Sequence, residues 1–472
     1  MVGTQDRWQE DLFVAGPLRE LIPEDHILKQ VDRILDLSWL RDEVKDAYHE
    51  TMGRPSIDPE AAVRLMLAGF FQGIVQDRKL MREARVNLAI RWFAGYRLDE
   101  ALPDHSTLTR IRQRWGVERF KRIFEHSVQS CIQAGLVNAE TVHVDATLIR
   151  ADVSWTSLVE VHAQQVLEAN SAGEPPPEDP APGKPPKAKK RSTTDPDASL
   201  ATSRNDQRLE PSYKEHVAVE DRSGVIVDVA VTTGEASEGA QLLEQIDRIE
   251  QATGTAVKAL TADTGYASAR NYAGLEAHTI DAIIPPQQTH GRPARIPSSR
   301  FKYDARHDVL RCPRGKALTR HVPGLNGYWY RSQARDCARC PLRTHCLPAT
   351  AKRRSILIVD GYPALLRARR RHARRSAHDH ELYTRHHWQI EGVHGRAKTQ
   401  HGLRRAVRRG LDNVSIQAYL TAAAMNLKRL ASRFLRKNVL GTLQTRTGWP
   451  FLLQARLLIP KAQGEIFVHD AA

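Results

Sequence analysis

The sequence is poor in cysteine and has no long hydrophobic run. Five cysteines in 472 residues are too few for the disulfide framework of a small secreted protein. No apolar stretch reaches the ~18 residues of a membrane-spanning helix, and Met1 to Glu10 lack the apolar core of a secretory signal. No GxxxxGK[ST] loop is present, which argues against an ATP-driven activity. We therefore expect a cytoplasmic protein without membrane contact.

Positive charge exceeds negative charge. The 70 Lys and Arg outnumber the 55 Asp and Glu, which gives a net charge of +15 at pH 7. Basic side chains gain free energy when they displace counterions from phosphates, so a nucleic acid is the favoured partner, although a soluble basic protein has the same balance. The excess is concentrated between Lys352 and Arg409, where 16 Lys and Arg stand against four acidic residues.

Residues 1–136 predict a helical domain. Pro59 is expected to begin one helix, and a second should run from about Asp77 to Gly95. A third follows the cap signal Pro103-Asp104-His105-Ser106.

The third helix has two distinct faces over residues 107–115. Its buried face is expected to carry Leu108, Ile111 and Trp115. Its opposite face carries Arg110, Gln113 and Arg114. Such a pair of faces is typical of a DNA recognition helix of the helix-turn-helix kind, and also of an ordinary Arg-rich surface helix.

Residues 137–286 alternate between strand and helix patterns. Strands are expected at 142–148, 213–220, 225–231, 257–261 and 281–284, with helices at 242–249 and 268–277. This order predicts a mixed α/β sheet. The Pro-rich residues 170–200 should form a flexible excursion.

The remaining chain divides into three parts. Residues 287–356 form a Cys-rich insertion, and a strand at 356–359 leads into residues 357–436, which contain helices at 382–400 and 414–435. Residues 437–472 form a tail.

Three acidic residues stand where an α/β sheet places catalytic groups. Asp145 lies in the first strand, Asp263 directly follows a later strand, and Glu391 lies in the helix 382–400. Three such carboxylates can converge on two divalent ions ~4 Å apart, which activate water or a 3′-hydroxyl in phosphoryl transfer. Oxygen ligands suit Mg²⁺ or Mn²⁺. Any one of these residues taken alone could instead be a turn or cap residue.

The helix around Glu391 is unusually rich in polar and basic groups. His387, Trp388, His394 and Lys398 share its face at helical spacing. Such a face can meet phosphate and an unstacked base, or can simply be solvated. Basic residues follow it at i, i+4 spacing, namely Arg404, Arg405, Arg408 and Arg409.

Four of the five cysteines are close in sequence. Cys312, Cys337, Cys340 and Cys346 give the spacing C-x24-C-x2-C-x5-C. Four thiolates within this length suit tetrahedral Zn²⁺ in a small zinc-ribbon-like unit, and free or redox-active thiols are the alternative. Cys131 lies in an apolar helix and is expected in the core.

Several segments, taken in order, carry a family likeness. They are Asp11-Leu12-Phe13, Gly53-Arg54-Pro55, Pro103 to Thr107, Val144-Asp145-Ala146-Thr147, Ser192 to Asp197, Tyr213-Lys214-x-His216, Ala262 to Tyr266, Ile390 to Gly395 with Lys398, Arg409-Gly410-Leu411 and Asn426-Leu427. From about residue 10 to 430, the chain resembles bacterial insertion-sequence transposases of the DDE class.

The resemblance implies a ribonuclease H-like core with a mixed five-stranded sheet, which follows a helical DNA-binding domain and is interrupted by the Cys-rich insertion. It implies that Asp145, Asp263 and Glu391 hold two Mg²⁺ or Mn²⁺ ions, and that Lys398 with Arg385 or His387 holds DNA-end phosphates. The implied partners are the terminal inverted repeats and target DNA, with a homodimer in the synaptic complex.

The chain departs from the family pattern Tyr-x2-Arg-x3-Glu-x6-Lys at two places. Lys398 matches, whereas His387 stands at the Arg position and Thr384 at the Tyr position. Tyr383 and Arg385 are each displaced from the pattern. A catalytically inactive copy that only occupies the repeats, or a nuclease without strand transfer, are the alternatives.

Overall fold

The computed structural model describes residues 16–49, 56–160, 190–201, 209–287, 295–324 and 326–446. Contacts between residues divide the chain into a unit Met1–Ala431 and a unit Ser432–Ala472. No helix in these described ranges is long and apolar enough to cross a membrane.

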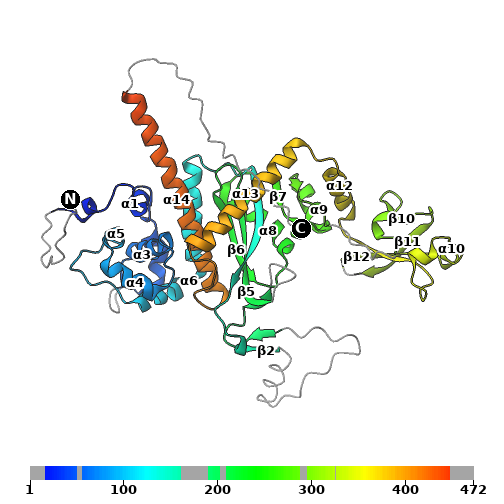
Figure 1. Ribbon diagram of the computed structural model, residues 1–472, viewed down its shortest axis with the longest axis horizontal. Helices are drawn as coiled ribbons and strands as arrows, with labels where there is room; N and C mark the ends of the chain where they lie inside the picture. Colours follow the sequence, from blue (N-terminus) through cyan, green and yellow to red (C-terminus); the bar gives the residue numbers. More distant parts are fainter. Residues whose placement is uncertain are drawn as a thin grey trace, which may run out of the picture. The chain divides into compact units, whose positions relative to one another are not determined.

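Helices fill the N-terminal part, as predicted (Figure 1). They are η1 (Leu18–Leu21), α1 (Ile27–Asp32), α2 (Leu40–Val44), η2 (Lys45–Ala47), α3 (Pro59–Phe71), α4 (Asp77–Val86), α5 (Leu88–Phe93) and α6 (His105–Gln133). The single helix expected from Asp77 to Gly95 is wrong. It breaks at Asn87, whose side-chain oxygen accepts a hydrogen bond from the Ile90 amide and so starts a new helix.

Helix α6 begins as predicted, because the Asp104 carboxylate accepts a hydrogen bond from the Ser106 amide. Gly116 has φ 73°, which only glycine adopts easily, and it separates residues 105–115 from the rest of the helix. Leu108, Ile111 and Trp115 are buried as expected.

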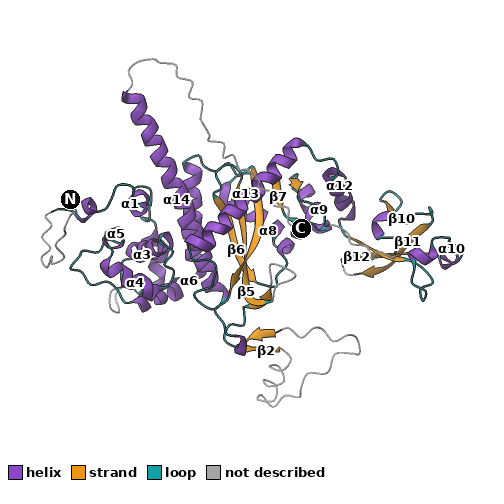
Figure 2. Ribbon diagram, viewed as in Figure 1, coloured by secondary structure: helices purple, strands orange, loops and turns teal. Residues whose placement is uncertain are grey.

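The main sheet contains eight strands among the described residues. They are β1 (Thr141–Arg150), β2 (Leu158–Glu160), β3 (Lys190–Ser192), β4 (Ser199–Ala201), β5 (Glu210–Glu220), β6 (Ile226–Thr233), β7 (Ala259–Ala262) and β8 (Asp281–Ile283). The central order is β6-β5-β1-β7-β8, in which β1 is antiparallel to β5 and parallel to β7. The predicted mixed α/β sheet is therefore confirmed (Figure 2).

The Pro-rich excursion predicted at 170–200 is only partly described. Residues 170–189 lie outside the described residues, whereas 190–192 and 199–201 form strands β3 and β4. These strands are ordered because β4 pairs with the start of β5 and β3 pairs with β2.

Helices cover both faces of the sheet. The helices are α8 (Leu242–Thr253), α9 (Ala269–Ala277), α12 (Tyr362–His372), α13 (Ala377–Gln400) and α14 (Leu411–Arg446), with short turns η3 (Trp155–Ser157), η4 (Glu238–Ala240) and η5 (Thr264–Tyr266). α13 packs against β1, β7 and β8, while α8 packs against β6 and α6. The buried Asn426 of α14 exchanges two hydrogen bonds with the Ile226 backbone and so satisfies the edge of β6.

The Cys-rich insertion forms its own antiparallel sheet. Its elements are η6 (Ser298–Arg300), β9 (Lys302–Asp304), β10 (Val309–Arg311), β11 (Ala317–Gly324), β12 (Gly327–Ser332), α10 (Ala334–Ala338), α11 (Arg343–Cys346) and β13 (Ser355–Val359). A separate small core includes Phe301, Leu310 and Tyr330. Since β13 pairs with β12, the strand predicted at 356–359 belongs to this sheet and not to the main one.

Candidate active site

Asp145 and Asp263 stand side by side on neighbouring parallel strands. The register of β1 and β7 pairs Val144 with Ala262, so the next residue along each strand is an aspartate on the same face. Asp263 lies just past the carboxyl end of β7, as the sequence predicted. Its carboxylate also accepts a hydrogen bond from the Gly265 amide at 2.7 Å, which fixes its direction.

The environment shifts the pKa values of the two carboxylates in opposite directions. Burial, and then the negative charge of Asp145, raise the pKa of Asp263 above its usual value. Burial also opposes ionisation of Asp145, but the nearby His394 outweighs it and the pKa of Asp145 is lowered. His394 Nε2 lies 3.5 Å from Asp145 Oδ2. Two close carboxylates of this kind attract a cation.

Helix α13 brings two of the predicted residues, His394 and Lys398, to this face of the sheet. His394 reaches Asp145, and Lys398 Nζ donates a 2.6 Å hydrogen bond to Thr147 Oγ1, two residues further along β1. The spacing fits because one helical turn advances about as far as two strand residues. Glu391 lies about one turn before His394 on the helix, but its side chain is 79% exposed and its nearest ionic partner is His387 at 3.9 Å.

The structure therefore brings Asp145, Asp263, His394 and Lys398 together and leaves the Glu391 carboxylate pointing to solvent. Within the described ranges, no group of three or more His, Cys, Asp or Glu side chains is placed to hold a metal ion. Trp388, one helical turn before Glu391, is 75% exposed.

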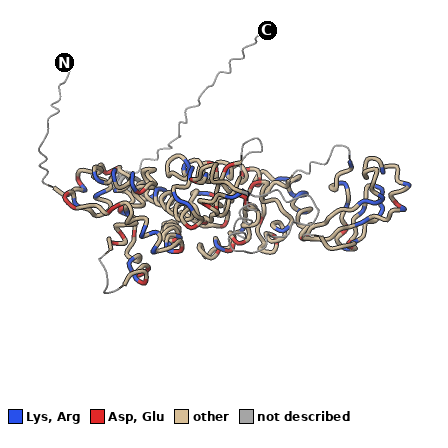
Figure 3. Tube along the Cα trace, turned by 90° about the horizontal axis from the view of Figure 1, so that it is seen from below, with Lys and Arg blue, Asp and Glu red and all other residues tan. Residues whose placement is uncertain are grey.

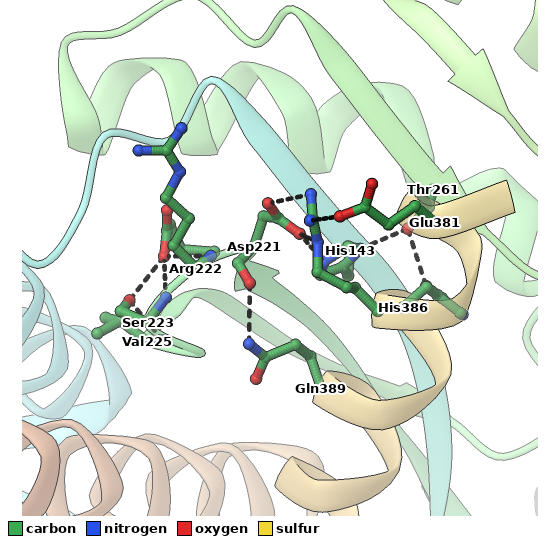
Figure 4. Close-up of polar contacts among 11 residues, drawn as sticks. His143, Asp221, Arg222, Ser223, Val225, Thr261, Glu381, His386 and Gln389 are labelled. Atoms are coloured by element: carbon green, nitrogen blue, oxygen red, sulfur yellow. Dashed lines mark hydrogen bonds and ion pairs between the residues drawn. The ribbon is translucent and has the colours of Figure 1, made fainter. Parts of the chain in front are cut away.

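A buried polar network that the sequence did not predict ties α13 to the sheet (Figure 4). Asp221 accepts hydrogen bonds from Arg385 at 2.8 and 2.9 Å and pairs with His143 Nε2 at 2.9 Å. His143 in turn contacts Thr261, and Thr261 contacts His386. Arg385, predicted to hold a DNA phosphate, is thus engaged with Asp221 and Glu381.

A second missed group is the buried Glu215 on β5. It pairs with Thr147 in the β1–β5 register and therefore shares the face of Asp145. Burial raises its pKa to about 7, although His394 and Lys398 act in the opposite direction. Its Oε2 atom has no hydrogen-bond partner among the described residues. The sequence predicted a strand at 213–220, and the alternation of side chains along that strand was the only sequence signal for the face on which Glu215 lies.

The basic residues after α13 lie in a loop, so the helical i, i+4 arrangement predicted for them is wrong. Ala406 N and Arg404 O pair with the Arg150 backbone and extend the end of β1. Arg405 pairs with Asp152 at 2.7 Å, Arg408 pairs with Asp77 at 2.5 Å, and Arg409 donates to the Asp152 carbonyl. Figure 3 shows Lys and Arg positions in blue along the trace, many of them close to acidic positions in red.

The predicted recognition face of α6 is exposed at Arg110, Gln113 and Arg114. Arg114 stacks over the Tyr48 ring at 4.8 Å, and Arg110 donates to Ser106. Between them lies Arg112, which is buried and paired with Asp77 at 2.7 and 3.0 Å. This face therefore has two exposed guanidinium groups, Arg110 and Arg114, on a helix that the buried Arg112–Asp77 pair holds in place.

The four cysteines of the Cys-rich insertion, Cys312, Cys337, Cys340 and Cys346, line one small cavity. Burial, opposed by Arg354, and the proximity of Cys337, Cys340 and Cys312 raise the pKa of Cys346. Cys131 is buried in the core as predicted, and burial raises its pKa to about 12.

Two family models match the chain. The family described as "Transposase domain (DUF772)" matches residues 17–114, and the family described as "Transposase DDE domain" matches residues 311–431. The predicted resemblance to DDE-class transposases is thereby confirmed, since both matched segments are transposase domains and one of them is a transposase DDE domain. The second match includes Glu391 and Lys398 and begins after Asp145 and Asp263.

Among solved structures, the chain is similar to the piggyBac transposase synaptic complex with hairpin DNA, at 9% identity over 88% of this chain and 81% of that chain, with a TM-score of 0.29. It is also similar to the Mos1 transposase paired-end complex with the left transposon end, at 11% identity over 52% of this chain and 65% of that chain, with a TM-score of 0.16. No curated protein matches the chain.

Proposed function

We propose that this protein is a Mg²⁺- or Mn²⁺-dependent DNA transposase that binds the terminal inverted repeats of an insertion sequence, cleaves its ends and joins them to target DNA. The observation that carries the proposal is the pair Asp145 and Asp263, adjacent on parallel strands in a chain that contains a transposase DDE domain. The strand order β6-β5-β1-β7-β8, with its antiparallel and parallel pairs, supports a ribonuclease H-like core.

The residues at this site suit a divalent cation. Asp145 and Asp263 supply hard oxygen ligands, and their mutual repulsion is relieved when a cation binds. Glu391 is the third ligand in the proposal, and its carboxylate, which now faces solvent, has to turn toward the pair to reach an ion. The bound ions would polarise the scissile phosphate and lower the pKa of the attacking water or hydroxyl.

The chain's own groups have separate roles in the proposal. Lys398, fixed by Thr147, and His387 contact the phosphates of the transposon end. His394 holds the Asp145 carboxylate in place. The exposed Trp388 stacks on an unpaired base at the cleavage site. Arg110, Gln113 and Arg114 contact the terminal repeat, with Arg404, Arg405 and Arg409 along the DNA path.

The Cys-rich unit is proposed to hold one structural Zn²⁺ between Cys312, Cys337, Cys340 and Cys346. Their shared cavity supports the assignment, although the thiols must move closer to bind one ion. Elemental analysis should find about one zinc per chain, lost in Cys340→Ser. Stoichiometric absence of zinc in the folded protein would refute this part.

The test of the function uses the full chain, Mg²⁺ and a supercoiled plasmid that carries both ends of the element. Wild type should nick the ends and join them to target DNA, and Asp145→Ala should reduce both reactions to background while still binding the ends. Undiminished nicking by Asp145→Ala contradicts the proposal.

The exposed position of Glu391 favours one second candidate, an inactive copy that only occupies the repeats. That candidate predicts that wild type binds the ends without metal-dependent cleavage. A synaptic homodimer is expected on the paired ends, and sedimentation of the DNA complex measures it.

A further inference from the structure

We propose that Glu238 is an additional carboxylate ligand of the divalent-cation site, sharing an ion with Asp263, and that the Tyr266 hydroxyl contacts the ion's water shell. This inference rests on the proposed metal site at Asp145 and Asp263, and extends it to a residue outside the Asp/Asp/Glu set.

Gly265 locates the two carboxylates relative to each other. A Cβ atom added at Gly265 would lie 2.6 Å from Glu238 Oε2 and 2.9 Å from Asp263 Oδ1. Two carboxylate oxygens that close to a common point can reach a single cation with small side-chain rotations. The absence of a side chain at Gly265 leaves the space between them open.

The loops that carry these residues are fixed against each other. The Asn271 side chain donates from Nδ2 to the Gly239 carbonyl at 2.8 Å and to the Tyr266 carbonyl at 2.9 Å. It thereby clamps η4, which begins with Glu238, to η5, which follows Asp263. A Cβ at Gly239 would lie 2.9 Å from Asn271 Nδ2, so the close approach depends on that glycine.

Tyr266 gives independent support for a ligand at this place. Its side chain is fully buried, yet its hydroxyl has no hydrogen-bond partner among the described residues. Burial, followed by the charges of Asp145, Glu238 and Asp263, raises its pKa well above the usual value. Because a buried phenol normally has a partner, a hydroxyl that feels the charge of three carboxylates and bonds to none of the described residues is suited to contact the water shell of an ion bound there.

A purely structural role for Glu238 leaves the local charge unbalanced. Lys214 Nζ lies 3.2 Å from Glu238 Oε1 and also donates to the Ala236 carbonyl. This pair uses one oxygen of Glu238 and offsets one of three negative charges. The cationic groups His394 and Lys398 act on Asp145, whereas Asp263 has no ion pair among the described residues, so a divalent cation would neutralise its half-buried charge.

The test measures metal binding by the full chain without DNA. Unbound Mn²⁺ is followed by its electron paramagnetic resonance signal for wild type, Glu238→Gln, Asp145→Asn and the matched control Glu244→Gln, an exposed residue six positions along the chain. We expect Glu238→Gln to weaken Mn²⁺ binding by roughly 10- to 100-fold. The control should bind like wild type.

The outcomes separate this inference from the proposed function. If Asp145→Asn loses Mn²⁺ while Glu238→Gln binds like wild type, the inference is wrong and the proposed metal site stands. If wild type binds no Mn²⁺, or Asp145→Asn binds it fully, the proposed metal site fails and this inference fails with it.

A second variant guards against misfolding of Glu238→Gln. Gly265→Ala keeps every carboxylate but places a methyl group between Glu238 Oε2 and Asp263 Oδ1. It should weaken Mn²⁺ binding at least as much as Glu238→Gln, with an unchanged circular dichroism spectrum. Mn²⁺ binding by folded Gly265→Ala at wild-type strength overturns the inference.

Discussion

Arg385 donates two hydrogen bonds to Asp221, at 2.8 and 2.9 Å, and so ties the helix that carries Glu391 to the turn after β5. Asp221 is buried and also pairs with His143 on β1. His143 lies two residues before Asp145 on the same strand. Gln389 Nε2 adds a 2.8 Å bond to the Asp221 carbonyl. One carboxylate thus sets the position of α13 over the two strands that carry the aspartates.

Replacing Asp221 by Asn should therefore destabilise the fold and slow cleavage together. The asparagine side chain cannot accept both hydrogen bonds from Arg385 and the one from His143. We therefore expect the free energy of unfolding to fall by about 2 kcal/mol. Urea unfolding measures the stability and plasmid nicking measures the rate. Asp247→Asn, on the exposed side of α8, is the control, and equal effects of the two variants would contradict this role.

The buried pair Asp77–Arg112 should matter more than the adjacent Arg408. Asp77 accepts from both arginines, but only Arg112 is fully buried. Asp77→Ala leaves that guanidinium buried without a partner, at a cost of roughly 3–5 kcal/mol, whereas Arg408→Ala leaves the Asp77–Arg112 pair intact. Urea unfolding of the two variants tests this order, and a larger loss in Arg408→Ala would reverse the assignment.

How far the sequence determines these features depends on the range of the interactions. Alternation over 142–148 predicted β1, and with it the face of Asp145, because strand side chains alternate within one segment. The burial of Arg112 could not be predicted, because its polar neighbours in the helix are exposed and its partner Asp77 lies 35 residues away in sequence. Arg408 was assigned to DNA for the same reason, since its pairing with Asp77 spans 331 residues. The helix break at Asn87 is local, and its capping side chain could have been recognised.

Arg110 should contribute to DNA binding without contributing to stability. It is exposed near the start of α6, where its guanidinium donates a hydrogen bond to the nearby Ser106 hydroxyl at 3.1 Å. Arg110→Ala should weaken binding to the transposon ends and lower the slope of log affinity against log salt by about 1. Fluorescence anisotropy over a salt series measures it. Arg122→Ala, on the same helix but paired with Glu43, should leave the slope unchanged.

Glu215 should make stability depend on pH in a defined direction. Burial raises its pKa from 4.5 to about 7 in the folded protein, with His394 and Lys398 facing it from α13. Between these pH values the folded state holds the proton more tightly, so this group lowers stability as pH rises from about 4.5 to 7. Glu215→Gln removes that penalty. The stability of the variant relative to wild type should be higher at pH 8 than at pH 5 by about 3 kcal/mol in metal-free urea unfolding. A difference that is constant with pH would show that Glu215 is ionised in the folded protein at both values.

Trp388 should act on DNA and not on the fold. At 75% exposure it adds little to the core, and it lies one helical turn from Glu391 on α13. Trp388→Ala should leave the urea midpoint unchanged and slow joining of the ends roughly 10-fold, in line with about 1–3 kcal/mol for stacking of one base. Trp388→Phe should restore most of the rate, because a phenyl ring still stacks. Trp329→Ala in the Cys-rich sheet removes another exposed tryptophan away from the aspartates and should not change joining. Equal joining by wild type and Trp388→Ala would exclude the stacking role and leave phosphate contacts to hold the end.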